Sequence, residues 1–189
     1  MPSLIAHSAA GLMVGWLHPA GSSRRRLAGR AGNLALVLLL ANVPDLDFVL
    51  QIALGGRIHH TFTHSIVFGL VFSAVLAALW VMIRHGSFGL TFSLIGMVYG
   101  SHVLLDMLGG GPGVQLLWPF SVDYVRFPWE VFPPVHYTRG LLDPSHATFI
   151  VFELVFSAAV LGVTLALKSR WARRTMVQAP GTAAEGDRR

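Results

Sequence analysis

Blocks of about twenty apolar residues constrain this chain more than any other feature of its sequence. Three such blocks, residues 65–83, 88–108 and 147–167, are rich in Leu, Val, Ala and Phe and contain almost no charge. A helix of about twenty apolar residues spans the hydrocarbon core of a bilayer. Only 12% of the 189 residues are charged, against roughly 25% in a soluble domain. The sequence therefore predicts spanning helices in place of a water-soluble core.

Two further apolar segments are less regular. Residues 33–54 are long enough to cross a membrane, but they contain Pro44, Asp45 and Asp47. Acidic side chains are costly in lipid unless they face protein or a cavity, so we predict a broken helix there. Residues 4–17 are too short for an ordinary span and predict a short helix, re-entrant or not, that packs against the others. The predicted fold is all-α: a polytopic helical membrane protein with about four spanning helices plus a short N-terminal helix.

The remaining segments connect these helices or follow them. Residues 109–146 are rich in Gly, Pro and aromatic residues, which suit either a membrane interface or the mouth of a cavity. Residues 172–189 are polar and rich in small residues, and they predict a disordered cytoplasmic tail. Residues 1–171 are expected to form one helical membrane domain.

Basic residues indicate the orientation, because cytoplasmic segments carry the excess of Lys and Arg. If the C-terminus is cytoplasmic, the inner segments contain Arg24, Arg25, Arg26, Arg30, Arg84, Lys168, Arg170, Arg173 and Arg174. The outer segments then contain only Arg57, Arg126 and Arg139. The sequence predicts a multi-pass protein of a bacterial inner (plasma) membrane with a cytoplasmic C-terminus. These clusters also account for the net charge of +5, so we expect membrane lipid, and not nucleic acid, as the partner.

Two histidine-containing pairs lie at the ends of apolar blocks. His60 and His64 are four residues apart at the start of one block, and His102 and Asp106 are four apart near the end of another. On a helix this spacing puts both side chains of a pair on one face. The predicted topology brings both pairs to the same outer face.

Other ionisable residues can join these pairs. Asp45 and Asp47 precede the first pair closely, and His7 lies in the short first helix. A single histidine in an apolar helix is more often a hydrogen-bonded core residue than a ligand, but a cluster with intramembrane acids favours function. The chain has no cysteine, so nitrogen and oxygen atoms must hold any metal. This donor set suits Zn, with Mn or Fe as alternatives, and one or two ions.

The other histidines are weaker candidates for a functional site. His18 and His85 lie in predicted inner loops and are expected to be solvated. His136 and His146 lie in the outer segment and are ligands, substrate contacts or neither. On a helix, His59 would point away from His60, toward substrate or solvent.

Four short strings occur in a fixed order: Asn-Val-Pro-Asp-Leu-Asp at 42–47, His-His-Thr-Phe-Thr-His-Ser at 59–65, Ser-His-Val-Leu-Leu-Asp at 101–106 and Trp-Pro-Phe at 118–120. Through these strings, and through His7, most of residues 1–121 resembles the YdjM-like membrane-bound metal-dependent hydrolase family. The family often has His-Arg where this chain has His59-His60, so either of these two can be the ligand. Our choice is His64 first, with His60 beside it.

The proposed ligands are also similar to the metal site of zinc-dependent phospholipase C and P1-type nucleases. That similarity matches His102 and Asp106 to a His-x-x-x-Asp pair and implies that Asp106 bridges two ions. Those enzymes also use a later His-x-x-x-Glu, whereas His146 is followed four residues later by Ile150. A full three-metal site is therefore not expected.

Together these features predict a membrane-bound metal-dependent hydrolase. We expect it to act by metal-activated water on a phosphoester such as a phospholipid or a lipid-linked phosphate. The predicted metal ligands are His7, Asp45, His64, His102 and Asp106. The predicted catalytic residues are Asp47 and His60, although Asp45 and Asp47 can each be base or ligand. The alternative is a non-catalytic membrane protein, either a metal-ion transporter or a regulatory protein that binds a partner.

Overall fold

The computed structural model describes residues 2–19, 30–56, 58–133 and 143–177. Its helices are α1 (Leu4–Leu17), α3 (Arg30–Asn42), α4 (Leu46–Leu54), α5 (Ile66–Arg84), α6 (Phe88–Met107) and α7 (Pro144–Val177), with a short 3₁₀ helix, η1 (Phe62–His64). Extended pairing within these residues is limited to isolated bridges between Gly109 and Phe132 and between Val114 and Val125. The prediction of an all-α fold is confirmed.

The spanning helices follow the apolar blocks. α5, α6 and residues Pro144–Arg173 of α7 are each long and apolar enough to cross a membrane. α3 and α4 form a fourth candidate span that bends by 47° between Asn42 and Leu46. Pro44 lies in this break, where its ring disfavours helical backbone at the preceding residue and its nitrogen has no hydrogen to donate. The predicted broken helix and the predicted number of spans are confirmed.

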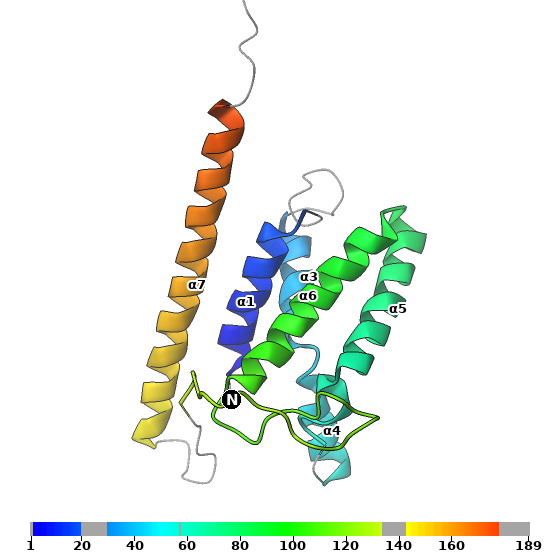
Figure 1. Cartoon of the computed structure of the whole chain (residues 1–189), viewed down its shortest axis with the longest axis vertical. Helices are drawn as coiled ribbons and strands as arrows, with labels where there is room; N and C mark the ends of the chain where they lie inside the picture. The colour runs from blue at the N-terminus through cyan, green and yellow to red at the C-terminus, as the bar shows by residue number, and fades with distance from the viewer. Residues whose placement is uncertain (1, 20–29, 57, 134–142, 178–189) are drawn as a thin grey trace, which may run out of the picture.

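Helix α1 occupies the middle of the bundle, where it packs against α3, α6 and α7 (Figure 1). Two glycines one turn apart permit the close approach to α3. A Cβ atom added at Gly11 would lie 2.5 Å from the Cβ of Ala41, and one added at Gly15 would lie 3.1 Å from Val37. Small residues at this spacing are a common way for membrane helices to pack. The expected packing of the short helix against the others is confirmed.

The outer face of α7 is apolar, but its inner face contains a buried acid that the sequence analysis did not single out. Glu153 is completely buried and accepts hydrogen bonds from the backbone nitrogen and the hydroxyl of Ser3. The Ser3 hydroxyl oxygen also caps α1, because it accepts a hydrogen bond from the Ile5 N–H at 3.2 Å. This contact fastens the start of α1 to α7.

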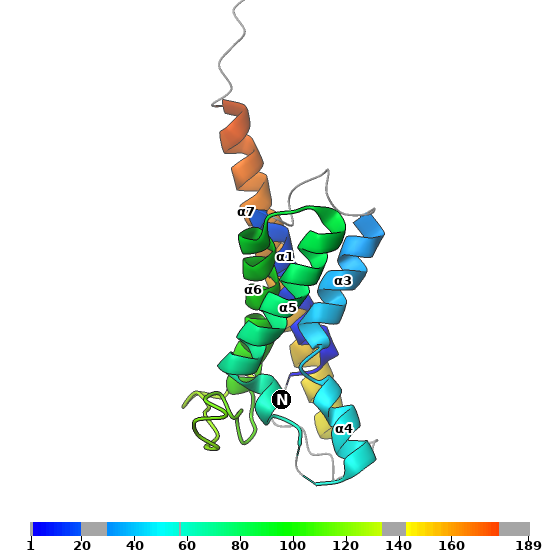
Figure 2. The same cartoon turned by 90° about the vertical axis from the view of Figure 1, so that its right-hand side faces the viewer.

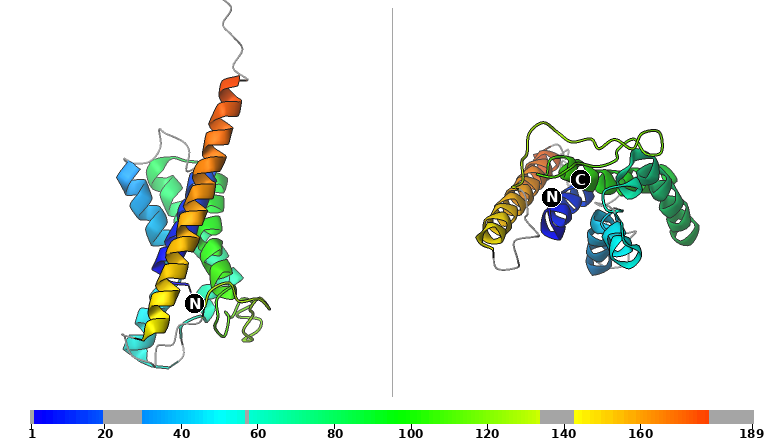
Figure 3. Two further views of the ribbon diagram at one scale, coloured as in Figure 1. Left: turned by 90° about the vertical axis from the view of Figure 1, so that its left-hand side faces the viewer. Right: turned by 90° about the horizontal axis from the view of Figure 1, so that it is seen from below.

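The two ends of the bundle differ in the elements that they contain. The start of α1, the α3–α4 break, η1, the end of α6 and the start of α7 all lie toward the lower end (Figures 1 and 2). Viewed from below, residues 109–133 run along one side of the bundle, while α3 and α4 lie on the other (Figure 3). The predicted site residues therefore belong to elements that meet at one end.

Some predictions concern segments beyond the described ranges. Arg24, Arg57, His136, Arg139 and residues 178–189 are outside them. Helix α7 continues to Val177, past the predicted start of the tail at residue 172. The remainder of the tail stays a prediction.

We predict that the lower end of the bundle faces away from the cytoplasm. Arg84 ends α5, and Lys168, Arg170 and Arg173 lie in the last turns of α7, all toward the upper end (Figure 1). Because basic residues are retained on the cytoplasmic side, alkaline phosphatase inserted within residues 109–146 should be active. The same reporter at the C-terminus should be inactive, and the opposite pattern would reverse the orientation.

Candidate metal centre

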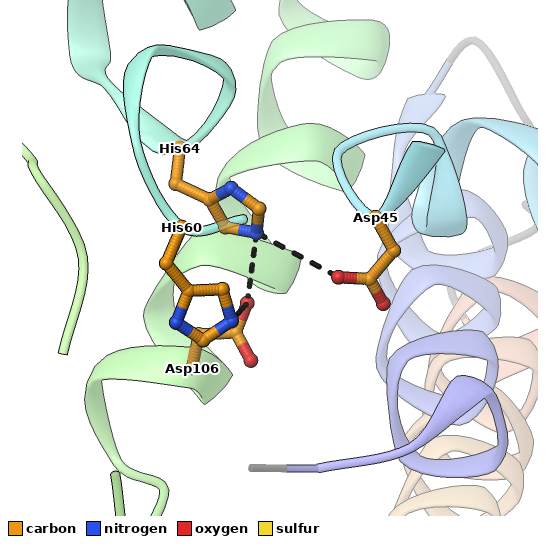
Figure 4. A group of neighbouring side chains, drawn as sticks. All are labelled: Asp45, His60, His64 and Asp106. Atoms are coloured by element: carbon orange, nitrogen blue, oxygen red, sulfur yellow. Dashed lines mark ion pairs between the residues drawn. The ribbon is translucent and has the colours of Figure 1, made fainter. Parts of the chain in front are cut away.

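The side chains of the candidate centre come from α1, the α3–α4 break, residues 60–64 and the end of α6. Asp45 immediately precedes α4 in the break of the α3–α4 pair. His64 ends η1, and Asp106 lies in the last turn of α6. His60 lies in the turn between α4 and η1, and His7 lies in the second turn of α1. Figure 4 shows Asp45, His60, His64 and Asp106 pointing toward one another.

The Asp106 carboxylate is the centre of this cluster. Its Oδ2 atom lies 3.1 Å from Nε2 of His102, 3.2 Å from Nε2 of His64 and 3.8 Å from Nε2 of His60. Its Oδ1 atom lies 3.5 Å from Nε2 of His7. All five side chains are almost completely buried. Four histidines thus direct the same ring nitrogen toward one carboxylate.

Three of these histidines are oriented through their other ring nitrogen. The Nδ1 atom of His102 donates to the carbonyl oxygen of Ala41 at 2.7 Å, and that of His60 donates to Gly113 at 3.0 Å. Nδ1 of His64 lies 3.3 Å from Oδ2 of Asp47. Such contacts fix the ring orientation of metal-binding histidines and leave Nε2 for the ion.

Several of the converging atoms lack hydrogen bonds. Among the described residues, both ring nitrogens of His7, Nε2 of His60 and both carboxylate oxygens of Asp106 are buried without a hydrogen-bond partner. The Nε2 atoms of His64 and His102 lie only 3.3 Å apart. Leaving a buried polar atom unsatisfied costs about 1–3 kcal/mol. A cation that accepts the lone pairs of Nε2 of His7, Nε2 of His60 and the Asp106 oxygens would remove that cost for these atoms, so the residues present fit a metal ion.

The donors divide into two groups that share Asp106. One group contains Asp45, His60, His64 and Asp106, and the other contains His7, His102 and Asp106. Within each group the possible ligand atoms lie within 4.8 Å of one another. A carboxylate has two oxygens and can contact two ions. Nitrogen and oxygen donors of this kind suit Zn, Mn or Fe, and the two groups are compatible with one or two ions.

Asp47, predicted to be catalytic, lies beside the centre and organises the loop before α5. Its Oδ2 atom accepts hydrogen bonds from the backbone nitrogen of His60 at 3.1 Å and from the Thr63 hydroxyl at 2.5 Å. Its Oδ1 atom accepts one from Nδ1 of His59 at 2.7 Å. A third set of possible ligands, Asp45, Asp47 and His59, lies at this side. Asp47 therefore positions two neighbouring histidines, His59 through its side chain and His60 through its backbone nitrogen.

The expectation that His60 and His64 share one helix face is wrong. Helix α5 begins only at Ile66, because the Ser65 hydroxyl caps it by accepting the Phe68 N–H at 3.1 Å. His60 precedes η1 with a positive φ of 68°, and this turn directs its ring toward Asp106. For His102 and Asp106 the helical expectation is confirmed, since both lie on the buried face of α6.

The two histidines of this loop have opposite shifts in pKa. Burial lowers the pKa of His60 to about 4 despite the nearby Asp106 carboxylate, so its ring is neutral and can act as a ligand. Burial also disfavours the charged form of His64. Contacts with Asp106, Asp45 and Asp47 outweigh this effect of burial and raise the pKa of His64 well above 6.5. A proton on His64 offsets the carboxylate charge in the way that a bound cation would.

Three further residues contribute. The sequence analysis left His59 open, as a ligand or as a side chain directed toward substrate or solvent, and it assigned no role to Thr63 or Tyr99. His59 contacts Asp47, and the Thr63 hydroxyl lies 3.0 Å from Nδ1 of His64. The Tyr99 hydroxyl donates to the carbonyl oxygen of Thr63. His59 and Thr63 belong to the string at 59–65, which was the available signal. No sequence signal indicated Tyr99, because only tertiary packing brings α6 against η1.

The remaining histidines lie elsewhere. His18 follows the last turn of α1 and its Nε2 atom lies 3.0 Å from the Ser93 hydroxyl, so it is buried and not solvated as expected. His85 is exposed and ends α5 in a left-handed conformation. His146 lies in the first turn of α7. None of the three belongs to the donor groups.

Comparison with known proteins identifies the family of this chain. The chain is 29% identical over 191 residues to inner membrane protein YbcI of Escherichia coli (strain K12), covering 92% of this chain and 100% of that protein. No solved structure matches significantly, and the similarity to phospholipase C and nuclease sites stays a prediction. Residues 1–171 match the family described as YdjM inner membrane protein. The chain is therefore a member of the YdjM inner membrane protein family.

Proposed function

We propose that this protein is a membrane-bound metal-dependent hydrolase. The observation that carries the proposal is the convergence of four buried Nε2 atoms on Asp106, within a bundle of candidate spanning helices. Buried ionisable residues in a membrane protein are costly and commonly mark a functional site. Here they form two overlapping sets of possible metal ligands.

Asp45, His60, His64 and Asp106 would hold one ion, and His7, His102 and Asp106 would hold a second. Bound Zn²⁺, or Mn²⁺ or Fe²⁺ in its place, supplies Lewis acidity, which makes water more acidic and stabilises negative charge on the attacked oxygen. Asp106 contributes negative charge to both groups, while the histidines remain neutral donors. The carbonyl oxygens of Ala41 and Gly113 keep His102 and His60 in the orientation that binding requires.

His59 and Asp47 are suited to proton transfer at the mouth of the site. The side chain of His59 is 17% exposed, and that of Asp45 is 24% exposed, whereas the other converging side chains are exposed by 3% or less. Asp47 accepts the Nδ1 proton of His59, which leaves Nε2 as the basic nitrogen. His59 would take a proton from the attacking water and return it to the leaving group.

A lipid phosphoester fits the surroundings of Asp45 and His59, the two most exposed side chains of the site. Phe48 of α4 lies edge-on to the His59 ring at 5.5 Å between centroids. Leu46, Phe48 and Val49, next to Asp45 in the chain, are about half exposed, at 56%, 48% and 59%. An amphiphilic substrate could keep its chains on this apolar surface while its phosphate reaches Asp45 and His59.

The test is phosphate-ester hydrolysis by purified protein in vesicles of phosphatidylglycerol or phosphatidic acid, with and without added Zn²⁺ or Mn²⁺. We expect metal-dependent release of the headgroup or of phosphate, and about a 10²–10⁴-fold loss of turnover in His59→Ala with metal content retained. Loss of metal in this variant would make His59 a ligand instead. Cation uptake into the vesicles without hydrolysis would favour a transporter.

A further inference from the structure

An apolar groove lies between α5 and α6, apart from the metal centre. It has a volume of about 280 Å³, and its walls include Ile66, Leu70, Tyr99, Val103 and Leu104. Leu70 and Leu104 are 51% and 48% exposed, so the rims of the groove belong to the outer surface of the bundle. Among the residues that the structure describes, no charged side chain lines it.

Glycines form part of the groove wall. Gly69, Gly96 and Gly100 all line it. A Cβ added at Gly69 would approach Tyr99 at 3.1 Å, and one at Gly96 would approach Ser73 at 3.6 Å. A Cβ at Gly100 would meet no atom within 4 Å. A methyl group at position 100 would therefore meet no protein atom, and a longer side chain there is expected to extend into the groove that Gly100 lines.

The α6 wall of the groove has about the length of one bilayer leaflet, and the α5 wall, from Ser65 to Leu70, is about 7.5 Å long. On α6 it runs from Gly96 to Met107, which is about 16 Å at 1.5 Å per residue. Half of a hydrocarbon core of about 30 Å is close to this value. Its outer end contains Ser65 and Met107, which follow His64 and Asp106 directly in the chain. The groove therefore descends into the membrane from the level of the metal centre.

We propose that this groove binds one acyl chain of a bilayer lipid in the leaflet on the side of the metal centre. An acyl chain matches the apolar walls, the lateral opening and the length. Water does not, because helical backbone groups are already paired and the lining offers almost no polar partners. This site is separate from the mouth at Asp45 and His59 and does not depend on the hydrolase activity.

A lipid chain in this groove would also support the loop that carries His64. The Tyr99 ring lines the groove, while its hydroxyl donates to the Thr63 carbonyl oxygen. The Thr63 hydroxyl in turn donates to Asp47. A lipid chain that packs against the Tyr99 ring would therefore contact a residue of the hydrogen-bonded network behind the metal centre, and it would not enter the centre.

The experiment uses the full-length protein in phosphatidylethanolamine and phosphatidylglycerol vesicles containing phosphatidylglycerol with a photoactivatable diazirine in its acyl chain. Cross-links are mapped by mass spectrometry. We expect the recessed groove residues Val103 and Met107 to be labelled at least as strongly as Val155, which is 64% exposed on α7. Gly100→Leu should reduce labelling at Val103 and Met107 severalfold relative to Val155, because it fills the groove.

Gly162→Leu is the matched control, since a Cβ at Gly162 on α7 also meets no atom within 4 Å and should leave labelling of the groove unchanged. Gly100→Ala should give a smaller decrease at the same residues, and it carries the test if Gly100→Leu does not fold. Labelling of Val103 and Met107 far below Val155, or groove labelling unchanged in every folded Gly100 variant, would overturn the proposal.

Discussion

We expect Asp106→Asn to remove both ions of the proposed metal centre from the purified protein. Asp106 is the only residue common to the groups centred on His64 and His102. Asparagine keeps the shape of the side chain but replaces two charged oxygens with one carbonyl oxygen and an NH₂ group that cannot bind a cation. Altering even the residues that contact the metal ligands weakens metal binding by about 10–100-fold. Loss of a ligand that both groups share should therefore lower the affinity for each ion by at least about 100-fold. Hydrolysis should fall to background.

Metal content measured by mass spectrometry checks this result against two other variants. His7→Ala should lose at most one ion, because His7 belongs only to the second group. Asp123→Asn is the matched control, since Asp123 is exposed and contacts Ser121 in the loop, and it should keep both ions. Loss of the same single ion in Asp106→Asn and His7→Ala would indicate a mononuclear site. Normal metal content and activity in Asp106→Asn would contradict the proposed centre.

His64→Ala and His102→Ala should each lose bound metal while the protein still inserts into the membrane. Each histidine presents Nε2 to Asp106 from a different group, so each variant should lose its own ion and bind the other more weakly. The affinity for the lost ion should fall by about 100-fold or more. Insertion depends on the apolar spans and not on these side chains.

Zinc titration of detergent-purified variants checks this prediction, and membrane fractionation checks insertion. His85→Asn is the matched control, because Asn also tolerates the left-handed backbone that His85 adopts at the end of α5. It should bind metal like the unaltered protein. Full occupancy in both His64→Ala and His102→Ala would exclude the proposed pairing of η1 with α6.

The spanning helices could be predicted from sequence because the bilayer imposes a local rule. Every backbone polar group in hydrocarbon must be paired within its own segment, so apolar length alone identifies a span. α5 and α6 accordingly match the apolar blocks within one residue at either end. The break at Pro44 was equally local, since it depends on one residue and on the acids beside it.

Part of the centre was also accessible from sequence. His102 and Asp106 share a face because helical spacing requires it, and both face the cluster. Asp45, His64 and His7 were expected there from topology and from resemblance, and each has a ligand atom within 3.7 Å of another member of the cluster. For these residues the expectation rested on the order of elements along the chain together with the resemblance.

The sequence by itself therefore determined the membrane fold and the end of the bundle where the acids and histidines meet. Tertiary structure alone decided how they meet. The turn at His60, the orientation of His102 by Ala41 and the position of Asp47 behind His64 depend on contacts between segments far apart in the chain. The placement of α1 at the centre of the bundle depends on the fit of Gly11 against Ala41. Periodicity cannot encode these contacts, because they follow from how surfaces of different helices pack.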